Sequence, residues 1–153
     1  YSACLELGDL SLQEGNPLSA ASYFRKATEI SPESHKAWAR LGTSLVEIGK
    51  IYEACRALEH AVELLPTYAE GYYNLAAIYA KKGELERARS FLTKALASDP
   101  NLAEAHQALG KVLERQGKLR KAWEHFLKAK VLKPALPGIN ADLRRLKLKL
   151  GRL

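Results

Sequence analysis

The sequence predicts an all-α solenoid built from repeated helix-turn-helix units. Four prolines, Pro32, Pro66, Pro100 and Pro134, lie 34 residues apart, and four further sets of identical residues follow the same step. A period of this length marks a fold of stacked supersecondary units. Such folds usually present a binding surface rather than a catalytic pocket, so the period also favours a binding role. The four sets are Leu7, Leu41, Leu75 and Leu109; Gly15, Gly49, Gly83 and Gly117; Ala20, Ala54, Ala88 and Ala122; and Ala27, Ala61, Ala95 and Ala129.

The first half of each repeat carries the pattern of an amphipathic helix. Trp38, Leu41 and Leu45 recur at steps of three and four residues, which places them on one face of a helix. Gly49 is expected to end this helix, because glycine readily adopts the backbone conformation of a tight turn. The second half repeats the helical pattern, with Ile51 and Leu58 among the residues on its apolar side.

Three dipeptides ending in proline predict helix starts. Asn16-Pro17, Ser31-Pro32 and Asp99-Pro100 each place a side chain that can cap a helix before a proline. Proline suits the first helical position, where no backbone N–H is needed for the helix. We therefore expect a helix to begin at each of these prolines.

Small residues that recur every 34 positions indicate that the two helices of a repeat approach closely. We expect glycine or alanine in the first helix to face the two alanine sets in the second, while larger side chains fill the remaining space. The small residues are Gly8, Gly42, Ala76 and Gly110, and the larger ones are Leu7, Phe24, Leu58, Leu92 and Phe126.

This pattern resembles the tetratricopeptide repeat. The residues that carry the resemblance are Trp38, Leu41, Gly42, Leu45, Gly49, Ala54, Leu58, Ala61 and Pro66. The resemblance covers four repeats, 1–34, 35–68, 69–102 and 103–136, and implies a right-handed superhelical α-solenoid. Departures are few: Cys4 and His106 stand where the family favours an aromatic residue, and Ala76 replaces a glycine.

Residues 137–153 begin a fifth repeat and stop. Leu143 continues the leucine set, and basic residues surround it. Since the end of a repeat array needs a solvated face, we expect these residues to form a basic capping helix.

No motif for catalysis, metal binding or a cofactor occurs in the chain. The sequence lacks a phosphate-binding glycine loop, HExxH, CxxC and a serine elbow. The histidines share no ligand spacing, although His106 and His125 could approach each other across one helix pair. We therefore expect no enzyme, no metal and no cofactor.

Three further features of the sequence concern the cellular location of the protein and its extent. No apolar run approaches the roughly 20 residues that a membrane span needs. Cys4 and Cys55 are interpreted as reduced thiols, which favours a reducing, intracellular compartment. A start at Tyr1, at the beginning of a repeat and without methionine, is interpreted as a segment of a longer protein.

The resemblance implies that the first helix of each repeat lines a concave groove that binds a peptide or helix of a partner protein. Tyr73 and Leu12 are expected to be apolar anchors, and Asn74 to bond the partner's backbone. Lys81, Lys111 and Arg115 suit an acidic segment. The expected groove residues are Leu5, Asp9, Leu12, Arg40, Thr43, Val46, Tyr73, Asn74, Ala77, Lys81, Gln107, Lys111 and Arg115.

The net charge of +7 rises along the chain, from −3 in residues 1–34 to +5 in 103–136 and +4 in 137–153. The basic end could meet an acidic partner segment, the acidic end of a second copy, or nucleic acid or an anionic membrane. Protein partners lead, because the cap has neither the Trp or Phe of many membrane anchors nor aromatic residues for base stacking. The expected basic patch comprises Lys118, Arg120, Lys121, Arg144, Arg145, Lys147 and Lys149.

Overall fold

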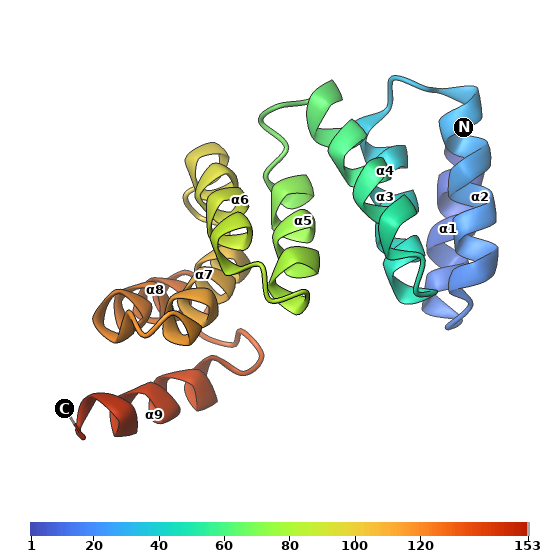
Figure 1. Cartoon of the computed structure of the whole chain (residues 1–153). Coiled ribbons are helices and arrows are strands. Elements are labelled where there is room, and N and C mark those ends of the chain that lie inside the picture. The colour runs from blue at the N-terminus through green and yellow to red at the C-terminus, as the bar shows by residue number, and fades with distance from the viewer. Residues whose placement is uncertain (153) are drawn as a thin grey trace. The chain divides into compact units, whose positions relative to one another are not determined.

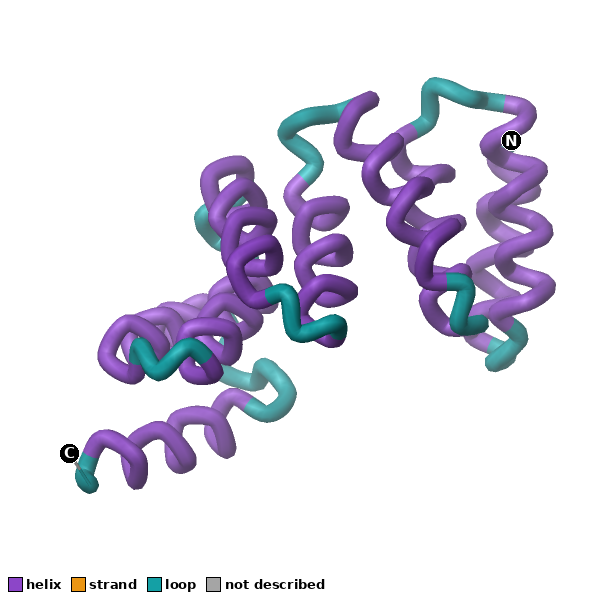
Figure 2. Tube along the Cα trace, viewed as in Figure 1, coloured by secondary structure: helices purple, strands orange, loops and turns teal. Residues whose placement is uncertain are grey.

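The computed structural model describes residues 1–152, and this range contains nine α-helices and no strand (Figure 1). Short loops join successive helices (Figure 2). The all-α fold class is therefore confirmed. The helices are α1 (Ser2–Gln13), α2 (Pro17–Ile30), α3 (His35–Glu47), α4 (Ile51–Leu64), α5 (Ala69–Lys81), α6 (Leu85–Ser98), α7 (Ala103–Arg115), α8 (Leu119–Leu132) and α9 (Ile139–Leu150).

The chain forms two compact units, an N-terminal unit of Tyr1–Leu75 and a C-terminal unit of Ala76–Leu153. In the N-terminal unit α1 packs against α2, α2 against α3, and α3 against α4. In the C-terminal unit α6 packs against α7, α7 against α8, and α8 against α9. The expected cap, 137–153, contains α9, and its residue 153 lies outside the described residues. The division into four repeats with the stated bounds stays a prediction, as does the right-handed superhelix.

The turn between paired helices depends on glycine. Gly15, Gly49, Gly83 and Gly117 all have φ between 72° and 82°, the left-handed region in which a side chain is strained. Gly49 follows the last residues of α3, as the sequence predicted.

Two of the three predicted helix starts are wrong. Asn16 does cap α2, since its Oδ1 accepts a hydrogen bond of 3.1 Å from Ser19 N and Pro17 opens the helix. Ser31 and Asp99, in contrast, end α2 and α6, and the next helices begin at His35 and Ala103. The residues after Ser31 and Asp99 form the turn between successive hairpins, so their prolines rigidify a loop rather than open a helix.

The core contains the small residues that the 34-residue step singled out. All eight residues of the two alanine sets are fully buried. The close approach of α7 and α8 leaves no room at Gly110, because a Cβ there would lie 2.6 Å from Cε1 of the fully buried Phe126. The packing explanation for these positions is therefore confirmed.

Leu7 was expected to fill the core, and this was wrong. Leu41, Leu75 and Leu109 are buried, whereas Leu7 is 43% exposed. The reason is that α2 packs on α3 and covers Leu41, whereas Leu7 lies on α1, for which α2 is the packing partner within the described residues. Among the described residues no helix has both the length and the apolar character that crossing a membrane requires.

Candidate functional site

Four of the expected groove residues, Ala77, Lys81, Lys111 and Arg115, meet around one hollow in the C-terminal unit. We call this the basic hollow; its volume is about 240 Å³. Residues of α5, α6 and α7 line it, namely Ala76, Ala77, Ala80, Lys81, Leu92, Ala108, Lys111, Val112 and Arg115. Alanine, leucine and valine supply its apolar lining, and three cations stand among them.

The cations of the basic hollow are placed to contact a ligand. Lys81, Lys111 and Arg115 are exposed, and neither lysine forms an ion pair within the described part of the chain. Arg115 Nη1 donates a hydrogen bond of 2.9 Å to the carbonyl oxygen of Ala80, which holds the guanidinium beside the hollow. An apolar surface flanked by cations suits a ligand that carries both an apolar side chain and a carboxylate.

The expected groove residues of the N-terminal unit form a mostly neutral surface. Arg40 forms an ion pair with Asp9, so the two charges compensate each other. Thr43 Oγ1 donates to the carbonyl oxygen of Arg40 at 2.9 Å. The other members are all half-buried: Leu5, Leu12, Val46, Tyr73 and Asn74.

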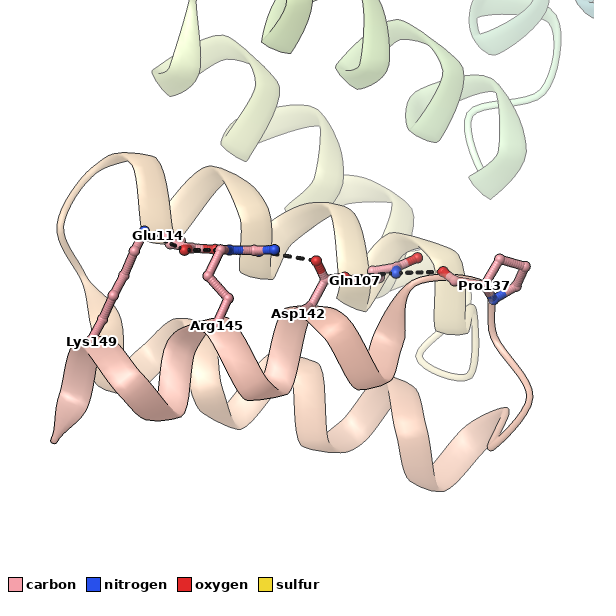
Figure 3. Close-up of polar contacts among 6 residues, drawn as sticks. All are labelled: Gln107, Glu114, Pro137, Asp142, Arg145 and Lys149. Carbon is pink, nitrogen blue, oxygen red and sulfur yellow. Dashed lines mark hydrogen bonds and ion pairs between the residues drawn. The ribbon is translucent and has the colours of Figure 1, made fainter.

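Gln107 does not line a groove, which corrects the sequence-based expectation. The residue is only 9% exposed and faces the start of α9 (Figure 3). Its Nε2 donates to the carbonyl oxygen of Pro137 at 2.9 Å and to Oδ2 of the buried Asp142 at 2.8 Å. The amide is therefore used to anchor the cap and is not exposed to a ligand.

Arg145 and Lys149 are likewise not free members of a basic patch. Both donate to Glu114 on α7: Arg145 Nε at 2.9 Å and Nη2 at 2.7 Å, and Lys149 Nζ at 2.5 Å (Figure 3). The Glu114 side chain is 6% exposed, and its hydrogen bonds from Arg145 are the main reason that its pKa falls to about 2. Arg145 also bonds Asp142 at 3.0 Å. We call these contacts among Gln107, Glu114, Asp142, Arg145 and Lys149 the cap network.

The other basic-patch residues remain available. Lys118, Arg120 and Lys121 are exposed around the start of α8 and form no ion pair with another described residue. Arg144 and Lys147 line a shallow hollow of about 580 Å³ on α9. The structure therefore splits the expected patch into five cations that form no ion pair with a described residue and two, Arg145 and Lys149, that hold the cap.

The predicted approach of two histidines is confirmed. His106 on α7 and His125 on α8 place their Nδ1 atoms 3.1 Å apart, and His106 Nε2 lies 2.8 Å from the carbonyl oxygen of Pro100. Since a carbonyl only accepts, His106 Nε2 carries a proton. Burial, and then the neighbouring His106, lower the pKa of His125 to about 4. In the described residues no group of three or more His, Cys, Asp or Glu could hold a metal ion.

The two compact units carry opposite charge. The N-terminal unit has six Lys and Arg against ten Asp and Glu, a net charge of −4, and the C-terminal unit has eighteen against seven, a net charge of +11. Sequence reasoning found this polarity, but it missed Glu114 and Asp142. Their only signal was that they are acidic residues in a strongly basic part of the chain.

Comparisons with known proteins agree with this architecture. Family models described as tetratricopeptide repeat match residues 45–112 and 1–34. Among solved structures, PilF of Pseudomonas aeruginosa has a TM-score of 0.90 and 25% identity, over 99% of this chain and 69% of that one. A thermophilic TPR protein of Thermus thermophilus has a TM-score of 0.83 and 27% identity, over 99% and 83%. MamA has a TM-score of 0.80 and 25% identity, over 98% and 82%. A comparison with curated protein sequences finds no match.

Proposed function

Since this chain belongs to the tetratricopeptide repeat family, we propose that it is a non-catalytic adaptor that binds a peptide or helix of a partner protein. Members of this family generally serve as protein-interaction scaffolds rather than enzymes. The partner would lie along the first helices of the repeats, in the concave groove that the family resemblance implies.

The basic hollow is the single observation from which we infer the chemistry of the partner segment. The hollow has a volume of about 240 Å³ and an apolar lining, and it would take one apolar side chain of a peptide. Lys81, Lys111 and Arg115 would then pair with neighbouring carboxylates, because hydrogen bonds between charged groups are stronger than neutral ones. The partner segment is therefore proposed to be acidic, with at least one apolar residue among its Asp and Glu.

The expected groove residues of the N-terminal unit are proposed to have roles of their own. Tyr73 and Leu12 are proposed as apolar anchors and Asn74 as a hydrogen-bond partner of the peptide backbone. Asp9 and Arg40 compensate each other and would contribute little net charge to the recognition.

A set of fluorescein-labelled acidic peptides tests the proposal. Each peptide carries one central Leu or Phe among Asp and Glu, and a matched set carries Asn and Gln instead. Fluorescence anisotropy should show binding of the acidic set only, weaker at high salt. Lys111→Ala should weaken binding about twofold to fivefold. Lys121→Ala is the matched control, because it removes the same charge from an exposed site outside the hollow.

A substitution that changes shape but not charge completes the test. Ala108→Leu would fill the basic hollow while leaving its three cations in place. It should weaken binding of the acidic peptides to a similar extent as Lys111→Ala. Equal binding by wild type, Ala108→Leu and Lys111→Ala would show that peptides do not use the hollow.

Self-association is a second candidate function, and the opposite charges of the two units favour it. The basic unit of one copy could meet the acidic unit of another, in a head-to-tail contact. Sedimentation at several salt concentrations would then show assemblies that dissociate as the salt concentration rises. A monomer at all salt and protein concentrations would refute this candidate without affecting the peptide proposal.

A further inference from the structure

The N-terminal unit contains a second and larger hollow, which is independent of the proposed groove. It has a volume of about 630 Å³ and is lined by residues of α2, α3 and α4. Trp38, Tyr52 and His60 give it an aromatic lining, and Ala57, Glu59 and Glu63 also contribute. We call it the aromatic hollow.

The 34-residue step explains why the space is present here. The positions that correspond to Ala57 hold aromatic rings in the other repeats, at Tyr23, Phe91 and His125. Phe91 stacks on Tyr79 with ring centroids 5.5 Å apart, and His125 meets His106. In the repeats of Phe91 and His125, a ring therefore occupies the space beside the first helix. Ala57 supplies only a methyl group at this place, so room remains for a side chain from outside.

Two aromatic rings form a fixed corner in this space. The rings of Trp38 and His60 lie 4.6 Å apart between centroids and are nearly perpendicular, at 79°. Trp38 Nε1 donates a hydrogen bond of 2.8 Å to the carbonyl oxygen of Pro32, which fixes the orientation of the indole. The face of an aromatic ring attracts a cation, and tryptophan does so most strongly.

The charged residues around the aromatic hollow carry a net charge of −1. Arg25 pairs with Glu53 at 3.4 Å, so these two charges compensate each other. Glu59 and Glu63 then oppose the single cation Arg56. The fold does not require an acid at Glu59, because the positions that correspond to it hold Arg25, Thr93 and Leu127. The surrounding unit adds to the attraction for a cation, since its net charge is −4.

We propose that the aromatic hollow binds an arginine side chain of a basic partner segment. The planar guanidinium can stack on an aromatic ring and donate hydrogen bonds to carboxylates at the same time, as a lysine ammonium cannot. Trp38 supplies the stacking surface, and Glu59 and Glu63 supply the acceptors. This site lies in the N-terminal unit and would bind a cation, whereas the basic hollow lies in the C-terminal unit and would bind an acidic segment. An experiment can therefore refute one of the two proposals without affecting the other.

The two tryptophans of the chain allow a direct test with the whole protein. Trp38 lies at the aromatic hollow and Trp123 lies on α8 in the other unit, so their indole N–H signals in a ¹H–¹⁵N spectrum report on the site and on an internal control. The probe is the tripeptide acetyl-Gly-Arg-Gly-amide. The comparison peptide contains citrulline, which is nearly isosteric with arginine but uncharged. The arginine peptide should shift the Trp38 signal saturably, and the citrulline peptide should bind at least about threefold more weakly.

Three variants sharpen the test. Glu59→Gln should weaken binding of the arginine peptide, and Arg56→Gln should strengthen it, because the two changes alter the local charge in opposite directions. Ala57→Phe restores the ring found at Phe91 and should abolish the shift, with circular dichroism confirming that the variant is folded. Equal affinity for the arginine and citrulline peptides would overturn the proposal. So would Trp38 shifts no larger than those of Trp123, or unchanged binding by folded Ala57→Phe.

Discussion

Replacing Gly110 by alanine tests whether the close approach of α7 and α8 determines which residues the helix pair accepts. The new Cβ would lie 2.6 Å from Cε1, 2.7 Å from Cδ1 and 3.0 Å from Cζ of Phe126. Phe126 is fully buried, so its ring cannot move into solvent. Overpacking of this kind costs about 1–3 kcal/mol. Alanine recovers about 1 kcal/mol through its higher helix propensity. Since three ring atoms of a fully buried side chain would be overlapped, the cost lies in the upper part of that range, at about 2–3 kcal/mol. After the recovery through helix propensity, we therefore expect Gly110→Ala to lower the free energy of unfolding by about 1–2 kcal/mol.

The chain itself provides the compensating change. One repeat earlier, Ala76 and Leu92 stand where Gly110 and Phe126 stand, and both are buried. Phe126→Leu alone removes ring atoms and should cost about 1–2 kcal/mol through the cavity that it leaves. The double variant recreates the Ala76 and Leu92 combination, so its destabilisation should be smaller than the sum of the two single effects by about 1 kcal/mol or more.

Urea unfolding followed by circular dichroism measures these effects, with the midpoint compared at an unchanged m-value. Gly42→Ala is a comparison at a second close approach, because its Cβ would lie 2.7 Å from Cγ of the buried Leu58 and 3.3 Å from the carbonyl oxygen of Ala54. We expect this variant to be destabilised as well. The reasoning would be refuted if Gly110→Ala were neutral or stabilising, or if its effect and that of Phe126→Leu simply added in the double variant.

Three further predictions concern the polar contacts of the C-terminal unit. Because the folded pKa of Glu114 is lowered from 4.5 to about 2, its contribution to stability is present above pH 4.5 and is lost as the pH falls towards 2. Glu114→Gln should therefore lower the melting temperature at pH 7, with a difference that disappears at low pH. The folded pKa of His125 is lowered from 6.5 to about 4, so the unfolded chain binds more protons between these values and stability falls as the pH drops from 6.5 to 4. His125→Gln should flatten this part of the curve of melting temperature against pH; an unchanged slope would contradict the assignment. Gln107→Leu should cost about 1–3 kcal/mol in urea unfolding, because the buried Asp142 loses a hydrogen-bond donor.

Much of the fold could be predicted from residues that recur every 34 positions. Ala20 and its counterparts are buried, and Gly15 and its counterparts adopt the left-handed conformation, because each repeat forms the same local structure. Prediction was weaker where the same local motif occurs both at a helix start and in a loop. Asn16-Pro17 opens a helix and Ser31-Pro32 lies in a loop, although both pair a capping residue with proline. Which use applies depends on where the preceding helix ends.

The candidate site was predicted only in part, and its errors have one physical cause. Ala77, Lys81, Lys111 and Arg115 do meet at the basic hollow. The errors, Gln107, Arg145 and Lys149, all lie where α9 docks on α7. The 34-residue step assigns each residue to a helix face, but it does not show which face a neighbouring helix will cover.

The sequence by itself therefore determined the architecture: helix pairs, glycine turns and a small-residue core follow from a period that every repeat obeys. The tertiary structure decided which side chains remain for a partner. Arg145 and Lys149 form ion pairs with Glu114, whereas Lys81 and Lys111 form no ion pair with a described residue, although in the sequence all four are simply basic residues. The aromatic hollow depends on the same distinction, since Ala57 leaves a space only because Trp38 and His60 are brought together around it. Pairing and burial are properties of neighbours in space, and the spacing of residues along the chain does not define those neighbours.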